Sequence, residues 1–410
     1  MTADMAVETV RDPAHGYTGE PPDRDGTELR VIVTRRSAEE LQIIVYGQGR
    51  WFRAGLEIGT TELWQLGARL RQLWSDLVVR HQSPDGSYGD KVGGYPLSER
   101  ADLSELATVT EELVTRLARE GYNLLATMLD GYDPDLEKAR DFLLDALTGP
   151  NPLRITFDSE VQLPWPMLAV DPSRCAGPWE AFLGYRHQVE QNDQTFWDHA
   201  PTAVRDQATT SLNKDTALDE VGRAPEVCQL LKDQSRLIIR TQGKELLDAL
   251  AAEILAEDLM YFWCHGHLSD NGNSGTFLSV RLSDDEHVDG PSVSARRRGI
   301  PRTPQTRFKP FVLLNACHTG RAGAPNALKH LGQELIRMGA AGVLAPQIDV
   351  PQVFAAEYAY GFLESYLAGE RTAGEISQSL VRDFAEKYHN PLALAYSLNC
   401  GIDSRLDLAS

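Results

Sequence analysis

In two short segments of the sequence, an apolar run is followed directly by residues that could perform nucleophilic or acid–base chemistry. The first is Tyr261-Phe-Trp-Cys-His-Gly-His267, and the second is Phe311-Val-Leu-Leu-Asn-Ala-Cys-His-Thr-Gly320. Each apolar run predicts a β-strand, and each polar, glycine-containing stretch predicts the turn that follows it. In a parallel sheet such strand ends share one edge, so the sequence predicts His265 and Cys317 there.

A cysteine and a histidine at one sheet edge predict nucleophilic catalysis. A thiol attacks a carbonyl as thiolate, so a nearby base must take its proton, and the resulting oxyanion needs backbone N–H donors. We expect His265 to be the base and Cys317 the nucleophile, with the N–H groups of Gly266 and Cys317 as oxyanion hole. His265 is followed directly by a glycine, whereas His267 is not. Cys317 is followed by a Thr-Gly turn, whereas Cys264 is not.

The same segments also contain the residue types of a zinc site. Adjacent strand residues point to opposite faces, however, and no Cys-x-x-Cys spacing is present. We therefore expect no metal and no cofactor from this candidate set: Cys264, His265, His267, Cys317 and His318.

The remaining sequence predicts an α/β fold in which helices flank a mostly parallel sheet. A hairpin is expected from 29–34 and 41–46, followed by helices over 61–79, 103–129 and 134–147 and a strand over 153–157. Later strands are expected over 236–240, 258–264, 311–315, 342–345 and 395–400, with a hairpin around 277–282. Further helices are expected over 244–256, 327–338 and 352–367, and from Thr372, where Glu375 gives a capping-box spacing.

Several stretches resemble the CHAT domain, a caspase-like peptidase family related to caspases and separase. Trp263-Cys-His-Gly266 and Leu313-Leu-Asn-Ala-Cys-His-Thr-Gly320 resemble its His-Gly and Ala-Cys-x-Thr-Gly signatures. The 52 residues from histidine to cysteine are close to the caspase interval of roughly 50. Segments 156–168, 338–350 and 390–396 are also similar, so the resemblance covers about residues 105–405. The departures are Pro166, Gln347, Ile348 and Tyr396, none of which belongs to the dyad.

The resemblance implies a cysteine endopeptidase that uses His265 as base and Cys317 as nucleophile, without an acidic third member. Asp349 matches the acidic residue of a separase-like loop beside the S1 pocket, which implies Arg or Lys at P1. The resemblance also implies that 101–230 is a degenerate caspase-like half and 231–410 the active half. Residues 1–27 are expected to be a leader, and 28–100 a small α+β region, rich in strand and helix, that binds a regulatory partner.

Family members often act in bacterial defence or regulated cell death, switched on by a sensor protein. The resemblance therefore implies a protein substrate and an activating partner. Two alternatives stay open: a non-catalytic adaptor with a caspase fold, and a cysteine hydrolase or transferase acting on a small molecule.

A basic cluster precedes the Cys317 strand, in a stretch rich in proline and glycine that predicts a loop. If the enzyme prefers basic P1 residues, this loop could be a self-cleavage or pseudosubstrate site, with Arg296, Arg297 and Arg298 as its centre. The other members of the cluster are Arg302, Arg307 and Lys309.

Composition narrows the classes of protein that fit. The 410 residues carry a net charge of −19, which disfavours direct binding to nucleic acid. No run approaches the roughly 20 apolar residues of a membrane span, and the first residues lack a signal-peptide pattern. The five cysteines are scattered, which argues against a disulfide framework. We expect a cytoplasmic protein.

Overall fold

The computed structural model describes residues 28–37, 39–82, 94–192, 206–270, 276–300, 303, 308–317 and 327–408, with only the backbone at 28, 267–270, 276–278, 317 and 327–330. The expected leader, 1–27, and residues 83–93 of the expected partner-binding region lie outside these ranges.

The described strands form one mixed sheet, whose main path runs β10-β9-β8-β11-β12-β13-β5-β4-β1-β2-β3. Strands β6 and β7 extend it beside β8. The bounds are β1 Glu28–Arg35, β2 Leu41–Gly47, β3 Arg50–Leu56, β4 Arg154–Ser159, β5 Gln188–Asn192, β6 Thr209–Lys214, β7 Arg236–Arg240, β8 Leu259–Asp270, β9 Thr276–Arg281, β10 His287–Asp289, β11 Phe311–Cys317, β12 Gly342–Pro346 and β13 Tyr396–Asn399.

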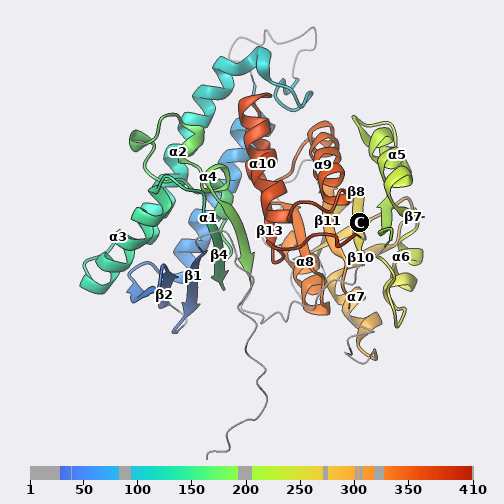
Figure 1. Ribbon diagram of the computed structural model, residues 1–410, viewed down its shortest axis with the longest axis horizontal. Coiled ribbons are helices and arrows are strands. Elements are labelled where there is room, and N and C mark those ends of the chain that lie inside the picture. The colour runs from blue at the N-terminus through green and yellow to red at the C-terminus, as the bar shows by residue number, and fades with distance from the viewer. Residues whose placement is uncertain are drawn as a thin grey trace, which may run out of the picture.

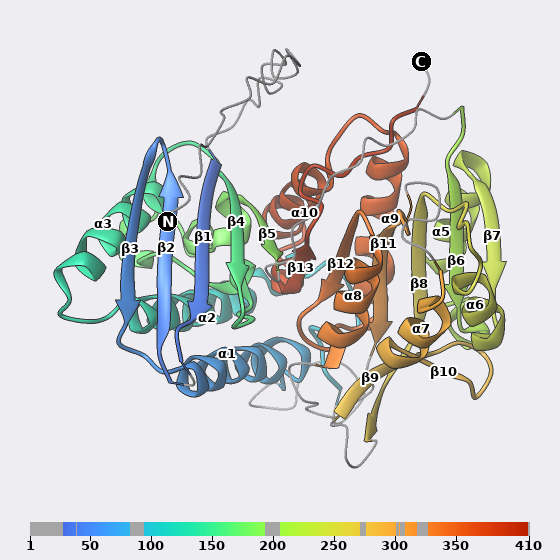
Figure 2. The same ribbon diagram turned by 90° about the horizontal axis from the view of Figure 1, so that it is seen from below.

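Helices flank this sheet (Figures 1 and 2). In the second half of the chain, α5 and α9 cover one face and α6, α7 and α8 cover the other. The helix bounds are α1 Thr60–Trp74, α2 Ala107–Met128, α3 Pro134–Thr148, α4 Leu183–Arg186, α5 Ala224–Gln234, α6 Gly243–Leu250, α7 Gly290–Arg297, α8 Ala327–Met338, α9 Gln352–Leu367 and α10 Ala373–Glu386. The predicted α/β class is confirmed.

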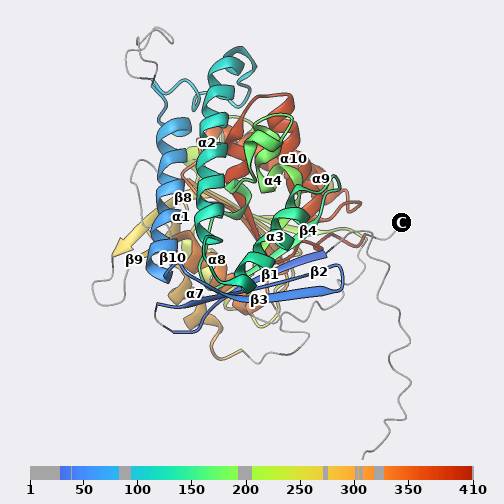
Figure 3. The same ribbon diagram turned by 90° about the vertical axis from the view of Figure 1, so that its left-hand side faces the viewer.

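The first half is a smaller layer, in which α1, α2 and α3 lie on one side of β1, β2 and β3 (Figure 3). The expected hairpin is present as the antiparallel pair β1 and β2, and β3 continues it. Strand β1 also pairs in parallel with β4, which connects this layer to the rest of the sheet.

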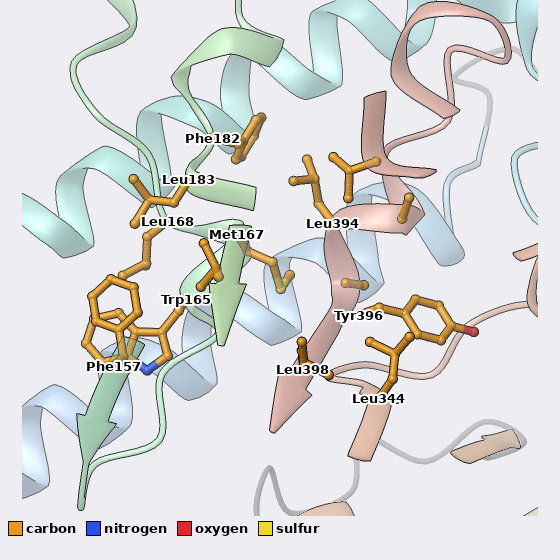
Figure 4. Packing of buried hydrophobic residues seen from close by; sticks show 14 of the residues in the cluster. Phe157, Trp165, Met167, Leu168, Phe182, Leu183, Leu344, Leu394, Tyr396 and Leu398 are labelled. Carbon is orange, nitrogen blue, oxygen red and sulfur yellow. The ribbon is translucent and has the colours of Figure 1, made fainter. Parts of the chain in front are cut away.

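One apolar cluster joins the two halves. Strand β13, near the end of the chain, lies between β12 and β5 and so links strands from both halves. Figure 4 shows Tyr396 and Leu398 of β13 in the right half of the view and the stacked pair Phe157 and Trp165, with ring centroids 3.9 Å apart, at the left. Because these side chains belong to one buried cluster, separating the halves would expose core.

Local sequence signals explain several helix ends. Helix α8 is followed by Gly339 at φ +116°, and α9 is followed closely by Gly369 at φ +74°, a region that favours glycine. Both sides of the predicted capping box are present at α10: the Thr372 hydroxyl accepts from the Glu375 N–H, and the Glu375 carboxylate accepts from the Thr372 N–H.

The structure corrects several predicted elements. Strand β8 continues to Asp270 instead of ending at 264, and α6 ends at Leu250 instead of 256. Part of the predicted basic loop is helix α7. Elements β3, β5, β6 and α5 were not predicted. Strand β6 lies before residue 230 and α5 spans it, yet both pack beside β7, β8 or α9, and the domain division at 230 stays a prediction.

Candidate active site

The predicted dyad residues lie on neighbouring parallel strands. Strand β8 pairs with β11 over seven registered positions, the last of which matches His265 with Cys317. Adjacent strands lie about 4.8 Å apart, so the two residues are direct neighbours across the sheet. The structure thus brings together two residues that are far apart in sequence.

His265 lies inside a strand, not beyond its end as predicted. Strand β6 pairs with β8 as far as Trp263, and β9 then takes its place from His265 onward. The histidine therefore sits where β8 changes one of its neighbours. Gly266 is buried and registered with Val280 of β9, so it too belongs to the strand and not to a turn.

The two sheet faces separate Cys264 from His265, two of the candidate metal ligands. Tyr261 and Trp263 point into the cluster that contains α5 and α9, and alternation places His265 on that face. Cys264 is fully buried in the opposite cluster, with α6, α7 and α8, as expected. Among the described side chains, no group of three His, Cys, Asp or Glu could hold a metal ion.

Asn315 anchors the strand that carries Cys317. Its side chain is fully buried, its amide donates to the Ala355 carbonyl of α9 at 2.9 Å, and its carbonyl accepts from the Tyr396 hydroxyl at 2.7 Å. These bonds fix the end of β11 to the helix behind it and to β13. Tyr396 was noted as a departure from the family pattern, and its hydroxyl supplies one of these bonds.

We expect Asn315→Ala to lower the free energy of unfolding by about 3 kcal/mol, because the substitution leaves the Ala355 carbonyl and the Tyr396 hydroxyl buried without these bonds. Tyr396→Phe is the matched control. It removes only one of the two bonds and should cost about 1 kcal/mol. Urea denaturation followed by tryptophan fluorescence measures both. A loss below 1 kcal/mol in Asn315→Ala would contradict the anchoring role.

Asp215 stands beside the histidine, and the sequence did not predict it. It directly follows β6, its side chain is only 11% exposed, and its Oδ2 lies 3.6 Å from the His265 Nε2. The signal was weak because β6 buries Thr210, Ser211 and Asn213 instead of an apolar run. The local sequence signal for the end of this strand was an aspartate followed by Thr-Ala-Leu, which forms a turn.

Asp349, the predicted S1 residue, lies in the segment that follows β12. Because β12 runs parallel to β11, this segment leaves the sheet at the same edge as Cys317. Asp349 is half-buried, and loss of solvation raises its pKa to about 7, an effect that the positive charge of Arg80 opposes.

The segment before Asp349 is held by the first half of the chain. The buried Arg71 of α1 donates through Nη2 and Nε to the Gln347 Oε1, at 3.0 and 3.2 Å, and through Nη2 to the Gln162 carbonyl at 2.9 Å. Burial lowers the pKa of Arg71 to about 10. Gln347, where the family often has another residue, is therefore a contact between the two halves.

The basic segment before β11 is more ordered than predicted. Arg296 and Arg297 belong to the last turn of α7, and Arg296 pairs with Asp248 at 3.3 Å. Arg297 donates to the carbonyls of Leu250 and Ala252 at 2.9 and 3.1 Å. Arg298 occupies the C-cap position, directly after the last residue of α7. Arg302 and Arg307 lie outside the described residues. Self-cleavage here stays a prediction, and it would require α7 to unwind.

No helix in the described part of the chain is long and apolar enough to cross a membrane. In the same part of the chain, Cys175, Cys228, Cys264 and Cys400 form no disulfide bonds.

Comparisons with known proteins agree with the family resemblance. The CHAT domain model matches residues 140–389, more than half of the chain. A protein named a probable protease from Vitiosangium sp. (strain GDMCC 1.1324) is 26% identical over 154 residues, which are 36% of this chain and 19% of that protein. The chain thus matches about a fifth of the length of this relative.

Two solved structures are similar in fold. The separase–securin complex of Saccharomyces cerevisiae matches with a TM-score of 0.44 and 10% identity, over 91% of this chain and 30% of that chain. The Arg specific cysteine proteinase gingipain R matches with a TM-score of 0.41 and 13% identity, over 67% of this chain and 69% of that chain. On the strength of the family model, the chain belongs to the CHAT domain family of caspase-like cysteine peptidases.

Proposed function

We propose that the protein is a cysteine endopeptidase in which Cys317 is the nucleophile and His265 the base. The observation that carries the proposal is the strand register, which pairs these two residues across neighbouring parallel strands. A base adjacent to a thiol raises the thiolate fraction at neutral pH, which is what attack on a peptide carbonyl requires.

The proposed reaction follows from this arrangement. His265 takes the proton of the Cys317 thiol, and the sulfur adds to the scissile carbonyl carbon. The N–H groups of Gly266 and Cys317 are the proposed donors to the oxyanion, since glycine has no side chain to shield its amide. The imidazolium then protonates the leaving amine, and water hydrolyses the thioester.

Asp349 is the proposed recognition residue for a basic P1 side chain. A partly buried carboxylate forms a strong charge-assisted pair with Arg or Lys. Because its pKa is raised to about 7, Asp349 would carry its full negative charge only above that pH. Preference for basic P1 residues should therefore increase through neutral pH.

The biological setting is proposed from the family. The enzyme would cleave a specific protein in the cytoplasm as part of bacterial defence or regulated cell death, after activation by a sensor protein. Residues 28–100 are the proposed contact for that sensor. The hydrogen bonds from Arg71 to Gln347 support this assignment, because they connect that region to the segment before Asp349.

An active-site probe tests the proposal. A peptidyl acyloxymethyl ketone with Arg at P1 should label Cys317, as located by mass spectrometry, and His265→Ala should prevent labelling. A matching probe with Leu at P1 should react more weakly. If neither probe labels Cys317 in folded wild-type protein, with or without its sensor, the non-catalytic adaptor becomes the better description. Reaction only with small electrophiles would favour a small-molecule hydrolase.

A further inference from the structure

Asp215 lies on the opposite side of the histidine from the thiol strand. Strand β11 with Cys317 pairs with one edge of β8, and β6, which ends just before Asp215, pairs with the other. The Asp215 Oδ2 is 3.6 Å from the His265 Nε2. An imidazole that directs Nε2 toward a carboxylate directs Nδ1 away from it.

Several bonds hold Asp215 in this position. Its N–H donates to the Trp263 carbonyl of β8 at 2.9 Å, and its Oδ1 accepts from the Ala217 N–H at 3.0 Å. The next residue, Thr216, donates its N–H to the Ser283 hydroxyl at 2.8 Å. The backbone at Asp215 is therefore fixed by β8 on one side and by the residues after β9 on the other, and the Ala217 N–H holds Oδ1 while Oδ2 lies toward the ring.

We propose that Asp215 is a positioning residue for His265, which makes the site a Cys-His-Asp arrangement instead of a dyad. This inference rests on the proposed function of Cys317. The carboxylate would hold the Nε2–H tautomer, so that Nδ1 accepts the thiol proton, and would stabilise the resulting imidazolium. Asp215 takes no proton itself. The 3.6 Å separation is longer than a hydrogen bond, as is common before substrate binds.

The other charges near the ring do not replace this carboxylate. Arg281 of β9 is registered with His265, and its guanidinium pairs with Asp285 at 3.5 Å. Lys214 and Asp219, on either side of the turn, pair with each other at 2.6 Å. Asp215 is thus the anionic residue that lies beside the ring, and Asp219 is a suitable control on the same turn.

The test compares Asp215→Asn with Asp219→Asn. Asparagine keeps an oxygen for the Ala217 N–H, so the turn should fold, but it removes the charge. We expect Asp215→Asn to slow alkylation of Cys317 by iodoacetamide at pH 7 about tenfold and to raise the pH midpoint of alkylation by about one unit, the effect of an opposite charge within 4–6 Å. The ¹⁵N signals of the His265 ring should show loss of the Nε2–H tautomer. Asp219→Asn should match the wild type in both measurements.

The two measurements separate this inference from the proposed function. If Asp215→Asn folds and both its alkylation profile and its His265 tautomer coincide with those of the wild type, Asp215 has no positioning role. If the tautomer changes in Asp215→Asn but the peptidyl ketones never label wild-type Cys317, the contact is real and the endopeptidase assignment fails. Asp215→Glu should restore part of the wild-type alkylation rate, because it returns the charge.

Discussion

Cys317→Ala will reduce cleavage of peptide substrates at least about a thousandfold, and His265→Ala will cause a loss of similar size. Members of a nucleophile–base pair act as a unit, so removing either one removes most of the chemistry. The double variant should therefore be no worse than either single variant. Initial rates with peptidyl-arginine and peptidyl-leucine aminomethylcoumarin substrates measure these effects.

A buried cysteine elsewhere provides the matched control for this prediction. Cys264→Ala alters the neighbouring position of β8 but acts on the opposite sheet face, and its rate should stay within about threefold of the wild type. Circular dichroism should confirm that all variants are folded. If Cys264→Ala abolished cleavage and Cys317→Ala did not, the nucleophile would be assigned to the wrong face of the sheet.

Asp349→Asn will change the P1 preference. Loss of a partly buried charge pair costs about 3 kcal/mol, so kcat/KM for an Arg substrate should fall about a hundredfold, whereas kcat/KM for a Leu substrate should change little. In the wild type, the ratio of Arg to Leu kcat/KM should rise as pH passes through about 7, where Asp349 ionises. Taking the ratio removes the pH dependence of the shared chemistry.

A surface carboxylate near the same arginine is the control for Asp349. Asp76 pairs with Arg80 at 3.2 Å on an exposed face, and Asp76→Asn should leave the Arg to Leu ratio unchanged. If Asp76→Asn and Asp349→Asn lowered the Arg to Leu ratio equally, the overall negative charge of the surface, and not a specific pocket, would attract the basic substrate.

Stability gives an independent measurement for Asp349. Its pKa in the folded protein is raised to about 7, whereas an unfolded aspartate titrates near 3.9. Between these values the folded chain binds more protons than the unfolded chain, so this group lowers stability progressively from about pH 4 to pH 7. Asp349→Asn should therefore melt at the wild-type temperature at pH 4 and at a higher temperature at pH 8. If Asp349→Asn and the wild type melted at the same temperature at pH 8 as well as at pH 4, the raised pKa would be contradicted.

The sequence predicted the elements whose apolar residues follow a regular period. Helices α8 and α9 have the predicted bounds, because their buried faces repeat and glycines follow them closely. The proposed dyad could also be predicted from the sequence, since His265 and Cys317 each follow an apolar run. Their in-register pairing could be seen only in the structure, because the order of strands depends on the whole sheet and not on local sequence.

Elements held by long-range polar contacts were missed. Strand β6 buries Asn213, whose amide reaches the Tyr261 carbonyl at 3.3 Å, and no local pattern signals such a bond. Helix α6 was predicted to continue through residues with good helix propensity. Its end is instead stabilised by Arg297, which donates to carbonyls at 250 and 252 from 45 residues or more along the chain. Asp215 escaped notice for the same reason, since its partner lies 50 residues away.

The strand pairing between β8 and β11 also changes the meaning of the distance from base to nucleophile along the chain. The described part of the connection does not separate the two strands, because β9 and β10 lie at one end of the main sheet path and α7 covers a face of the sheet. Insertions or deletions in this connection can alter the count of 52 residues without displacing either strand. Related proteins can therefore differ widely in the number of residues between the histidine and the cysteine. A search that compares strand order will find relatives that a search for a fixed interval would exclude.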